Sequence, residues 1–139
     1  MSTRGTAFFE IQNESGDSNE KSIKVGRIGI AHDGYPSGFG KKICNLLDAV
    51  YVANSTESVK PPSAKVFNNV EGVILHLLYE IPSDYLFDDE YVYRFIFNPS
   101  IRKESVYRVE DIITVEVIHQ YNRYNFSGTF AEFKAFCND

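Results

Sequence analysis

Hydrophobic and polar positions along the chain recur with two different periods, which predicts a mixture of strands and helices. A two-residue period, in which alternate side chains share one face, is typical of strands. It occurs in Thr6–Gln12, where Phe9 and Ile11 share a face, and again in Ile23–His32. A polar connector over residues 13–22 joins the two segments. We therefore expect a hairpin, with Gly29 marking a bulge or a close approach of two backbones.

A helical period of apolar residues predicts two longer helices. The first begins at Ser37 or Gly38, and its apolar stripe consists of Phe39, Ile43, Leu46, Leu47 and Val50. The second spans Ala64–Glu80, with Ser63 as its expected N-terminal cap and Pro82 as its stop. The intervening residues 54–63 include two prolines and four Ser or Thr residues, so we expect a loop there.

The second half of the chain is typical of strands followed by a short helix. Tyr91–Phe97, Val106–Val109 and Ile112–Tyr121 are rich in β-branched and aromatic residues. A break is expected near residues 110–111, and a turn region over residues 122–128. Thr129 and Glu132 then have the spacing of a capping box. The inner face of the helix that follows is expected to consist of Phe130, Phe133, Phe136 and Cys137.

The order of these elements predicts a single α+β domain over residues 1–139. We expect an antiparallel or mixed sheet of about four to five strands, covered by two longer helices and a short C-terminal helix. The length of 139 residues suits one domain. Nine Tyr and eleven Phe without a Trp favour a core that contains a sheet.

The charge of the chain argues against nucleic acid as a partner. The formal net charge is −5, whereas nonspecific nucleic-acid binding needs clustered positive charge. No membrane association is expected either, because no apolar run approaches the roughly 20 residues of a membrane span. No secretion signal is visible. We therefore expect a cytoplasmic protein, in the host cell if its origin is viral.

No motif for a cofactor or a metal is recognised. The two cysteines, Cys44 and Cys137, lie far apart in the sequence and match no zinc pattern. We expect both to be reduced, unlinked and buried as small apolar side chains. The acidic residues near the start of the second half, Asp84, Asp88, Asp89 and Glu90, lack the spacing of a calcium loop and are expected to be a solvated segment.

The most crowded stretch of special residues is His32–Gly40, between the second strand and the first helix. Asp33-Gly34 favours a turn, and Tyr35 before Pro36 is held extended. One interpretation is a tight connection in which the glycines relieve crowding. The other is an anion or phosphate site at the start of the helix. On this second interpretation the ligand-binding residues are Arg4, His32, Asp33, Gly34, Tyr35, Gly38 and Gly40.

Arg4, beside Gly5, suggests a link between the start of the chain and this turn. We expect Arg4 to form a bidentate pair with Asp33, or alternatively to hold a bound anion. His32 is the one histidine beside this candidate site and is a candidate acid or base. A hydrolase that uses Ser2 as an N-terminal nucleophile is a further alternative.

Thr3-Arg4-Gly5 and, further on, Asp33-Gly34-Tyr35-Pro36-Ser37-Gly38-Phe39-Gly40 carry a family resemblance. Over residues 1–50 the chain resembles a group of small uncharacterised proteins of phages and other mobile elements, found also in some bacteria and fungi. The resemblance implies a viral or mobile-element origin. Small proteins of that kind often bind and block host or defence proteins. We therefore expect a binding protein, whose partner is a host or defence protein or a second copy. The alternative is a protein that binds or cleaves a small phosphorylated ligand at the turn.

Overall fold

Two sheets and three α-helices make up the part of the chain that the structure describes. The computed structural model describes residues 3–12, 22–53, 65–84, 87–102, 104–121, 123 and 125–138. Over these residues, one sheet has five strands and the other has three. The fold is therefore α+β with a mixed main sheet, as the sequence predicts. The loops expected over residues 13–22 and 54–63 lie almost entirely outside the described residues, as does Ser2.

The main sheet has the strand order β2-β1-β5-β7-β8. Its strands are β1 (Gly5–Gln12), β2 (Ser22–Ile30), β5 (Tyr91–Phe97), β7 (Ile113–His119) and β8 (Phe126–Thr129). The expected hairpin of β1 and β2 is confirmed. Strand β1 also pairs with β5 in parallel, whereas β5, β7 and β8 pair antiparallel. The central strand β5 thus joins the two halves of the chain.

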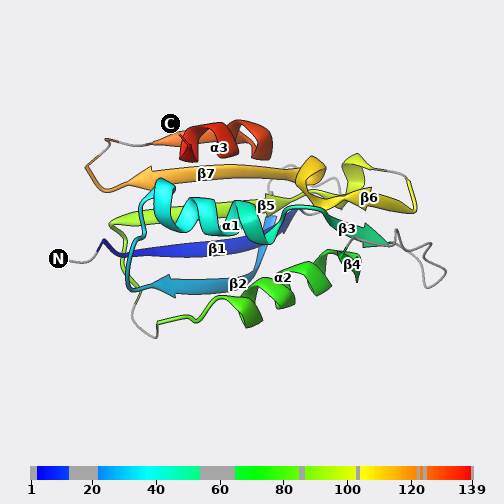
Figure 1. Ribbon diagram of the computed structural model, residues 1–139, viewed down its shortest axis with the longest axis horizontal. Coiled ribbons are helices and arrows are strands. Elements are labelled where there is room, and N and C mark those ends of the chain that lie inside the picture. Colours follow the sequence, from blue (N-terminus) through cyan, green and yellow to red (C-terminus); the bar gives the residue numbers. More distant parts are fainter. Residues whose placement is uncertain are drawn as a thin grey trace.

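The helices lie on one face of this sheet. A π-helical turn over Pro36–Gly40 continues into α1 (Lys41–Leu46), and the other helices are α2 (Asn69–Glu80) and α3 (Phe130–Cys137). In Figure 1, α1 crosses β1 and β5, α2 runs beside β2, and α3 lies near β7. The expected capping box starts α3, because the Thr129 hydroxyl accepts the Glu132 N–H and the Glu132 carboxylate accepts the Thr129 N–H.

Aromatic side chains of β5 form the centre of the core on this face. Tyr91, Tyr93, Phe95 and Phe97 are all buried. Phe9 of β1 stacks on Phe95, with ring centroids 5.5 Å apart. Phe39 of the π-helical turn lies 5.1 Å from Tyr93, and Phe133 of α3 lies 5.6 Å from Phe95, centroid to centroid. The aromatic residues of β5 are therefore core residues, in line with the sheet-containing core that the Tyr and Phe content favours.

The opposite face of the sheet is polar at its centre. Arg94 of β5 donates two hydrogen bonds to Glu10 of β1, at 2.7 and 2.8 Å, and one to Glu116 of β7, at 3.0 Å. Ser22 donates a further bond to Glu10 at 2.6 Å. Only 2% of Glu10 is exposed. The hydrogen bonds from Arg94 outweigh the effect of burial and lower the pKa of Glu10.

A small second sheet lies at the end of the main sheet where β5 ends and β7 begins (Figure 1). Its order is β4-β3-β6, from β3 (Val50–Ala53), β4 (Lys65–Asn68) and β6 (Val106–Arg108). Two non-glycine residues with positive φ mark its borders. Ala49, with φ 55°, precedes β3, and Asn69, with φ 57°, follows β4.

Several element boundaries that the sequence predicts are wrong. The first helix ends at Leu46, so Val50 is buried in strand β3 and not on a helix. The second helix begins at Asn69, because residues 65–68 form β4. Strand β8 occupies part of the expected turn region. Leu46 is only half-buried, whereas 1% of Leu47 is exposed. The remaining strands agree with the prediction to within two residues at each end, a normal uncertainty at element ends.

Stability should fall as the pH is lowered through the folded-state pKa of Glu10. Because folding lowers this pKa, the stabilisation is complete above the pKa of an unfolded Glu, about 4.3, and is lost as the pH drops below it. We expect Glu10→Gln to flatten the acid limb of the stability curve, measured as urea midpoints against pH. Glu80→Gln, at an exposed residue, is the control. Parallel acid limbs for Glu10→Gln and the unmodified protein would contradict the role of Glu10 in the pH dependence of stability.

Candidate functional site

The turn that the sequence singles out forms the wall between two clefts. Residues 35–37 face a first cleft of about 520 Å³. Residues 32, 33, 38 and 39 face a second cleft of about 560 Å³. The turn is therefore where concave surface lies, although its residues do not converge on a single site.

Backbone hydrogen bonds fix the turn and occupy its N–H groups. The Gly34 N–H donates to the Thr3 carbonyl at 3.0 Å, and the Gly34 carbonyl accepts the Tyr93 hydroxyl. The Gly38 N–H donates to the Tyr35 carbonyl, and the Phe39 N–H to the Asp33 carbonyl, at 2.9 and 2.8 Å. Burial raises the pKa of Tyr93, so its hydroxyl remains a donor. The Gly38 and Phe39 amides that an anion would use are thus engaged within the chain.

Close packing explains two of the glycines. A Cβ at Gly38 would lie 2.5 Å from the Asp33 carbonyl oxygen. A Cβ at Gly40 would lie 2.4 Å from the Cys137 Sγ and 3.2 Å from the Phe133 ring. Gly38 therefore lets the turn close on itself, and Gly40 lets α3 approach the first helical segment. Both findings favour the interpretation of the turn as a tight connection.

Arg4 and Asp33 form no ion pair, so that prediction is wrong. Arg4 is exposed, lines neither of the two clefts, and its backbone N–H donates to Glu90 at 3.3 Å. The Asp33 carboxylate accepts the Tyr35 hydroxyl at 3.2 Å instead, and this bond raises the pKa of Tyr35. The two segments are nevertheless neighbours, as expected, because Gly34 is hydrogen-bonded to Thr3.

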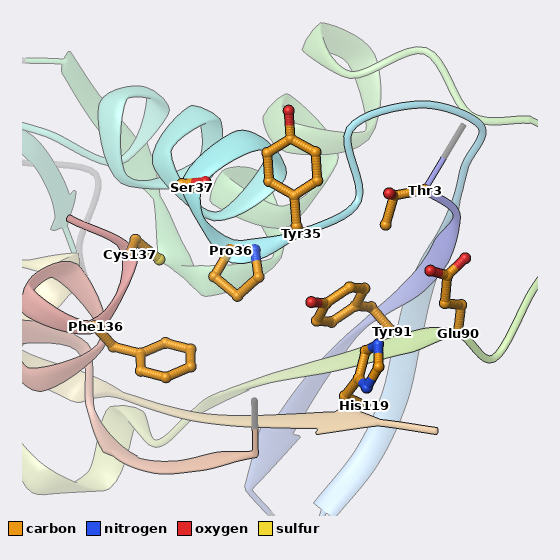
Figure 2. Close-up of a pocket in the computed structure, with 9 residues that line it drawn as sticks. All are labelled: Thr3, Tyr35, Pro36, Ser37, Glu90, Tyr91, His119, Phe136 and Cys137. Atoms are coloured by element: carbon orange, nitrogen blue, oxygen red, sulfur yellow. The ribbon is translucent and has the colours of Figure 1, made fainter. Parts of the chain in front are cut away.

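The first cleft is lined mainly by residues that the sequence does not single out as a site. Figure 2 shows its lining: Thr3, Tyr35, Pro36, Ser37, Glu90, Tyr91, His119, Phe136 and Cys137. The Tyr91 and His119 rings lie 4.5 Å apart, centroid to centroid, because these residues are register partners at the ends of β5 and β7. The side chain of Phe136 stands opposite them in Figure 2.

The hydrogen bonds of His119 define its tautomer. Its Nδ1 accepts the Tyr121 N–H at 3.2 Å, so the neutral ring carries its proton on Nε2. Among the described residues, the Glu90 carboxylate is the one charged side chain of the lining, and no Lys or Arg lines this cleft. Its chemistry therefore suits a neutral or cationic planar group better than a phosphate. The pairing of β5 with β7 creates this site, and a local sequence motif does not show it.

The second cleft contains groups of both charges. Lys42 and His32 line it together with Asp33 and Asp84. The last of these follows α2 and is joined to β2, since its N–H donates to the Gly29 carbonyl at 2.9 Å. The close backbone approach expected at Gly29 is therefore present, and the bulge of β2 lies elsewhere, opposite Phe9 and Glu10. Of the expected site residues, His32, Asp33 and Gly38 lie at this cleft.

Comparison of the chain with family models, curated proteins and solved structures found no match. Within the described ranges, no three His, Cys, Asp or Glu side chains are grouped as a metal site. None of the helices in that part of the chain combines the length and the apolar character needed to cross a membrane. The function is therefore argued from the surfaces of this molecule.

Gly40→Ala should destabilise the protein, because its new methyl group would overlap the Cys137 sulfur. We expect a loss of about 1–3 kcal/mol in the free energy of unfolding, the usual cost of overpacking. Gly72→Ala is the matched control, since its Cβ would have its nearest neighbour, the Phe67 Cβ, at 3.5 Å within α2. It should stabilise by about 0.5–1 kcal/mol through helix propensity. Equal effects of the two substitutions in urea unfolding would refute the packing role of Gly40.

Proposed function

We propose that the protein acts by binding another protein, and that it does so along the edge of the main sheet formed by β2. The observation that carries the proposal is an apolar surface on β2 and on the helix that packs beside it. Ile23 and Val25 on β2 are 57% and 43% exposed, and Leu75 and Tyr79 on α2 are 66% and 85% exposed. We refer to these four residues, with Lys24 and Arg27, as the edge surface.

The backbone of β2 is available for pairing along most of its outer side. β2 is one of the two edge strands of the main sheet. Among the described residues, Ser83 and Asp84 occupy that side, through hydrogen bonds to Gly29 near the end of the strand. Unpaired edges attract other strands, which is why natural proteins guard them with charges and bulges. The exposed Lys24 and the bulge of β2 are such guards, so a partner strand has to accommodate both.

Helix α2 extends the apolar surface beyond the strand. The methyl groups of Leu78 and Ile74 would lie 3.0 and 3.6 Å from a Cβ at Gly26, so α2 packs directly on β2. Leu75 and Tyr79, one turn apart on α2, continue this surface outward. A partner strand on β2 would therefore meet exposed apolar side chains of the helix as well as backbone groups, a combination that gives both affinity and specificity.

The charges of the edge surface select an acidic partner segment. Lys24 and Arg27 are both exposed. Each lies over an aromatic ring, of Phe8 at 4.4 Å and of Phe87 at 3.9 Å from the centroid. Neither forms an ion pair with a described carboxylate. Lys24 and Arg27 give β2 two positive charges, although the whole chain has a net charge of −5 and Asp88 and Asp89 line the small cleft that contains Arg27. We infer an extended partner segment in which acidic residues alternate with apolar ones.

The same proposal has three further parts. The partner segment belongs to a host or defence protein, the chain has a phage-type origin, and it acts in the cytoplasm. Their support is the resemblance of residues 1–50 and, for the location, the finding on the helices given above. Self-association through the same edge is an alternative that the experiment below distinguishes.

The test is selection of short peptides that bind the protein from a randomised display library. We expect the selected peptides to alternate acidic and apolar residues. The double variant Lys24→Glu with Arg27→Glu should weaken their binding at least tenfold, or by about 1.4 kcal/mol. Lys41→Glu, an exposed residue of α1, should leave it unchanged. The proposal would be overturned by selected peptides that lack acidic residues, or by equal peptide binding to the original protein, the double variant and the Lys41→Glu variant. Concentration-dependent dimerisation that Lys24→Glu abolishes would also overturn it.

A small phosphorylated ligand is the second candidate, and Lys42 beside His32 in the second cleft is the observation that favours it. Pyrophosphate is a simple probe for this chemistry. If the candidate is correct, titration calorimetry should detect pyrophosphate binding that Lys42→Ala abolishes and that salt weakens. Lys41→Ala, at the adjacent exposed residue, should bind normally. The absence of heat with the unmodified protein would remove this candidate and leave the edge surface untouched.

A further inference from the structure

Two buried thiols meet where the first helical segment packs on α3. Cys44 lies on α1 and Cys137 on α3, and both are free, as the sequence predicts. They are 8% and 1% exposed. The Cys137 sulfur lies against the helical turn that begins at Gly40 and carries Cys44, so the two side chains are neighbours across the contact of α1 with α3. Gly40, one turn before Cys44, lacks a side chain and so lets the Cys137 sulfur approach the helix.

We propose that Cys44 and Cys137 form a peroxide-reactive dithiol, which converts reversibly to a disulfide that ties α1 to α3. The proposal rests on the juxtaposition of the two side chains on two separate elements. Neighbouring thiols on two packed helices can approach to the disulfide bond length of about 2.05 Å through a local shift of the helices. This modification site is independent of the edge surface on β2.

The surroundings assign different roles to the two thiols. The interaction with Cys137 and the nearby Lys134 ammonium outweigh burial and lower the pKa of Cys44. The same interaction and burial raise the pKa of Cys137. Because the thiolate is the nucleophile in thiol chemistry, Cys44 attacks the peroxide and Cys137 resolves the product.

The first cleft leads to the resolving thiol. Cys137 lines this cleft beside Pro36 and Phe136 (Figure 2). A molecule as small as hydrogen peroxide fits readily in a cleft of about 520 Å³. The cleft therefore gives a small oxidant a route to the Cys137 side of the thiol pair, and Cys44 lies behind it on α1.

The reaction balances with hydrogen peroxide as the oxidant. The Cys44 thiolate attacks one peroxide oxygen, the O–O bond breaks, and hydroxide leaves with a proton as water, which gives a sulfenic acid at Cys44. The Cys137 sulfur then attacks the Cys44 sulfur and gives up its proton. The S–O bond breaks, a second water leaves, and the disulfide forms. The two thiols lose two electrons and two protons in total, and the peroxide gains them.

The test is intact-mass analysis of the full-length chain after exposure to hydrogen peroxide. We expect the loss of two hydrogens, reversal by dithiothreitol, and a melting temperature that is higher for the oxidised protein. The Cys137→Ser variant should instead gain one oxygen atom, as a sulfenic acid at Cys44 that dimedone traps. Cys44→Ser should react more slowly than Cys137→Ser. Progressive oxygen addition to the unmodified protein without loss of two hydrogens would overturn the proposal.

A second variant separates the native geometry from the presence of two cysteines. Ala135→Cys combined with Cys137→Ser keeps two thiols but places one at an exposed residue of α3. We expect this protein to form the intramolecular disulfide far more slowly than the unmodified protein under the same peroxide exposure. Urea-unfolded protein should also be slower, because its thiols are no longer held together. Equal rates for the folded, relocated and unfolded forms would also overturn the proposal.

Discussion

The other layers of the structure depend on the aromatic row of β5, which consists of Tyr91, Tyr93, Phe95 and Phe97. Tyr93 stacks on Phe95, with centroids 6.1 Å apart, and touches Phe39 of the turn that precedes α1. Its hydroxyl reaches through the core to the Gly34 carbonyl, so one side chain supports both the helical layer and the turn between the two clefts. On the other face of the same strand, Arg94 binds carboxylates of both neighbouring strands. A slip of one residue would exchange these two faces, so the aromatic row and Arg94 together fix the register.

The predictable part of the fold is the part in which local periodicity and burial agree. Strand β5 alternates along its whole length and was located correctly, and the Thr129 capping box identifies the start of α3 from two residues. The missed strands β3 and β4 are four residues long, and their apolar residues continue helical stripes in the sequence. Ala49 and Asn69 end those stripes through positive φ values. Alanine gives no sequence signal for that conformation, which tertiary pairing imposes.

The candidate site was only partly predictable, for a related reason. The crowding of glycines correctly indicates a tight turn, and the turn does border both clefts. The residues that give the first cleft its chemistry, Glu90 and His119, become neighbours only through the register of β5 and β7. The contact between Cys44 and Cys137 depends likewise on the packing of α3 against α1. The spacing of residues along the chain does not show such contacts, and a long separation between two cysteines argues against a contact between them.

The parallel pairing of β1 with β5 has a consequence for the order in which the protein is made. Phe9 needs Phe95 as its stacking partner, and Phe95 belongs to the second half of the chain. During synthesis, the first hairpin and the segment of α1 leave the ribosome well before β5 exists. Their apolar faces stay exposed until β5 has been made, as in other folds dominated by long-range contacts. A nascent chain halted before residue 91 would therefore be a natural client for chaperones, and a truncated product of that length would be prone to aggregate and to be degraded.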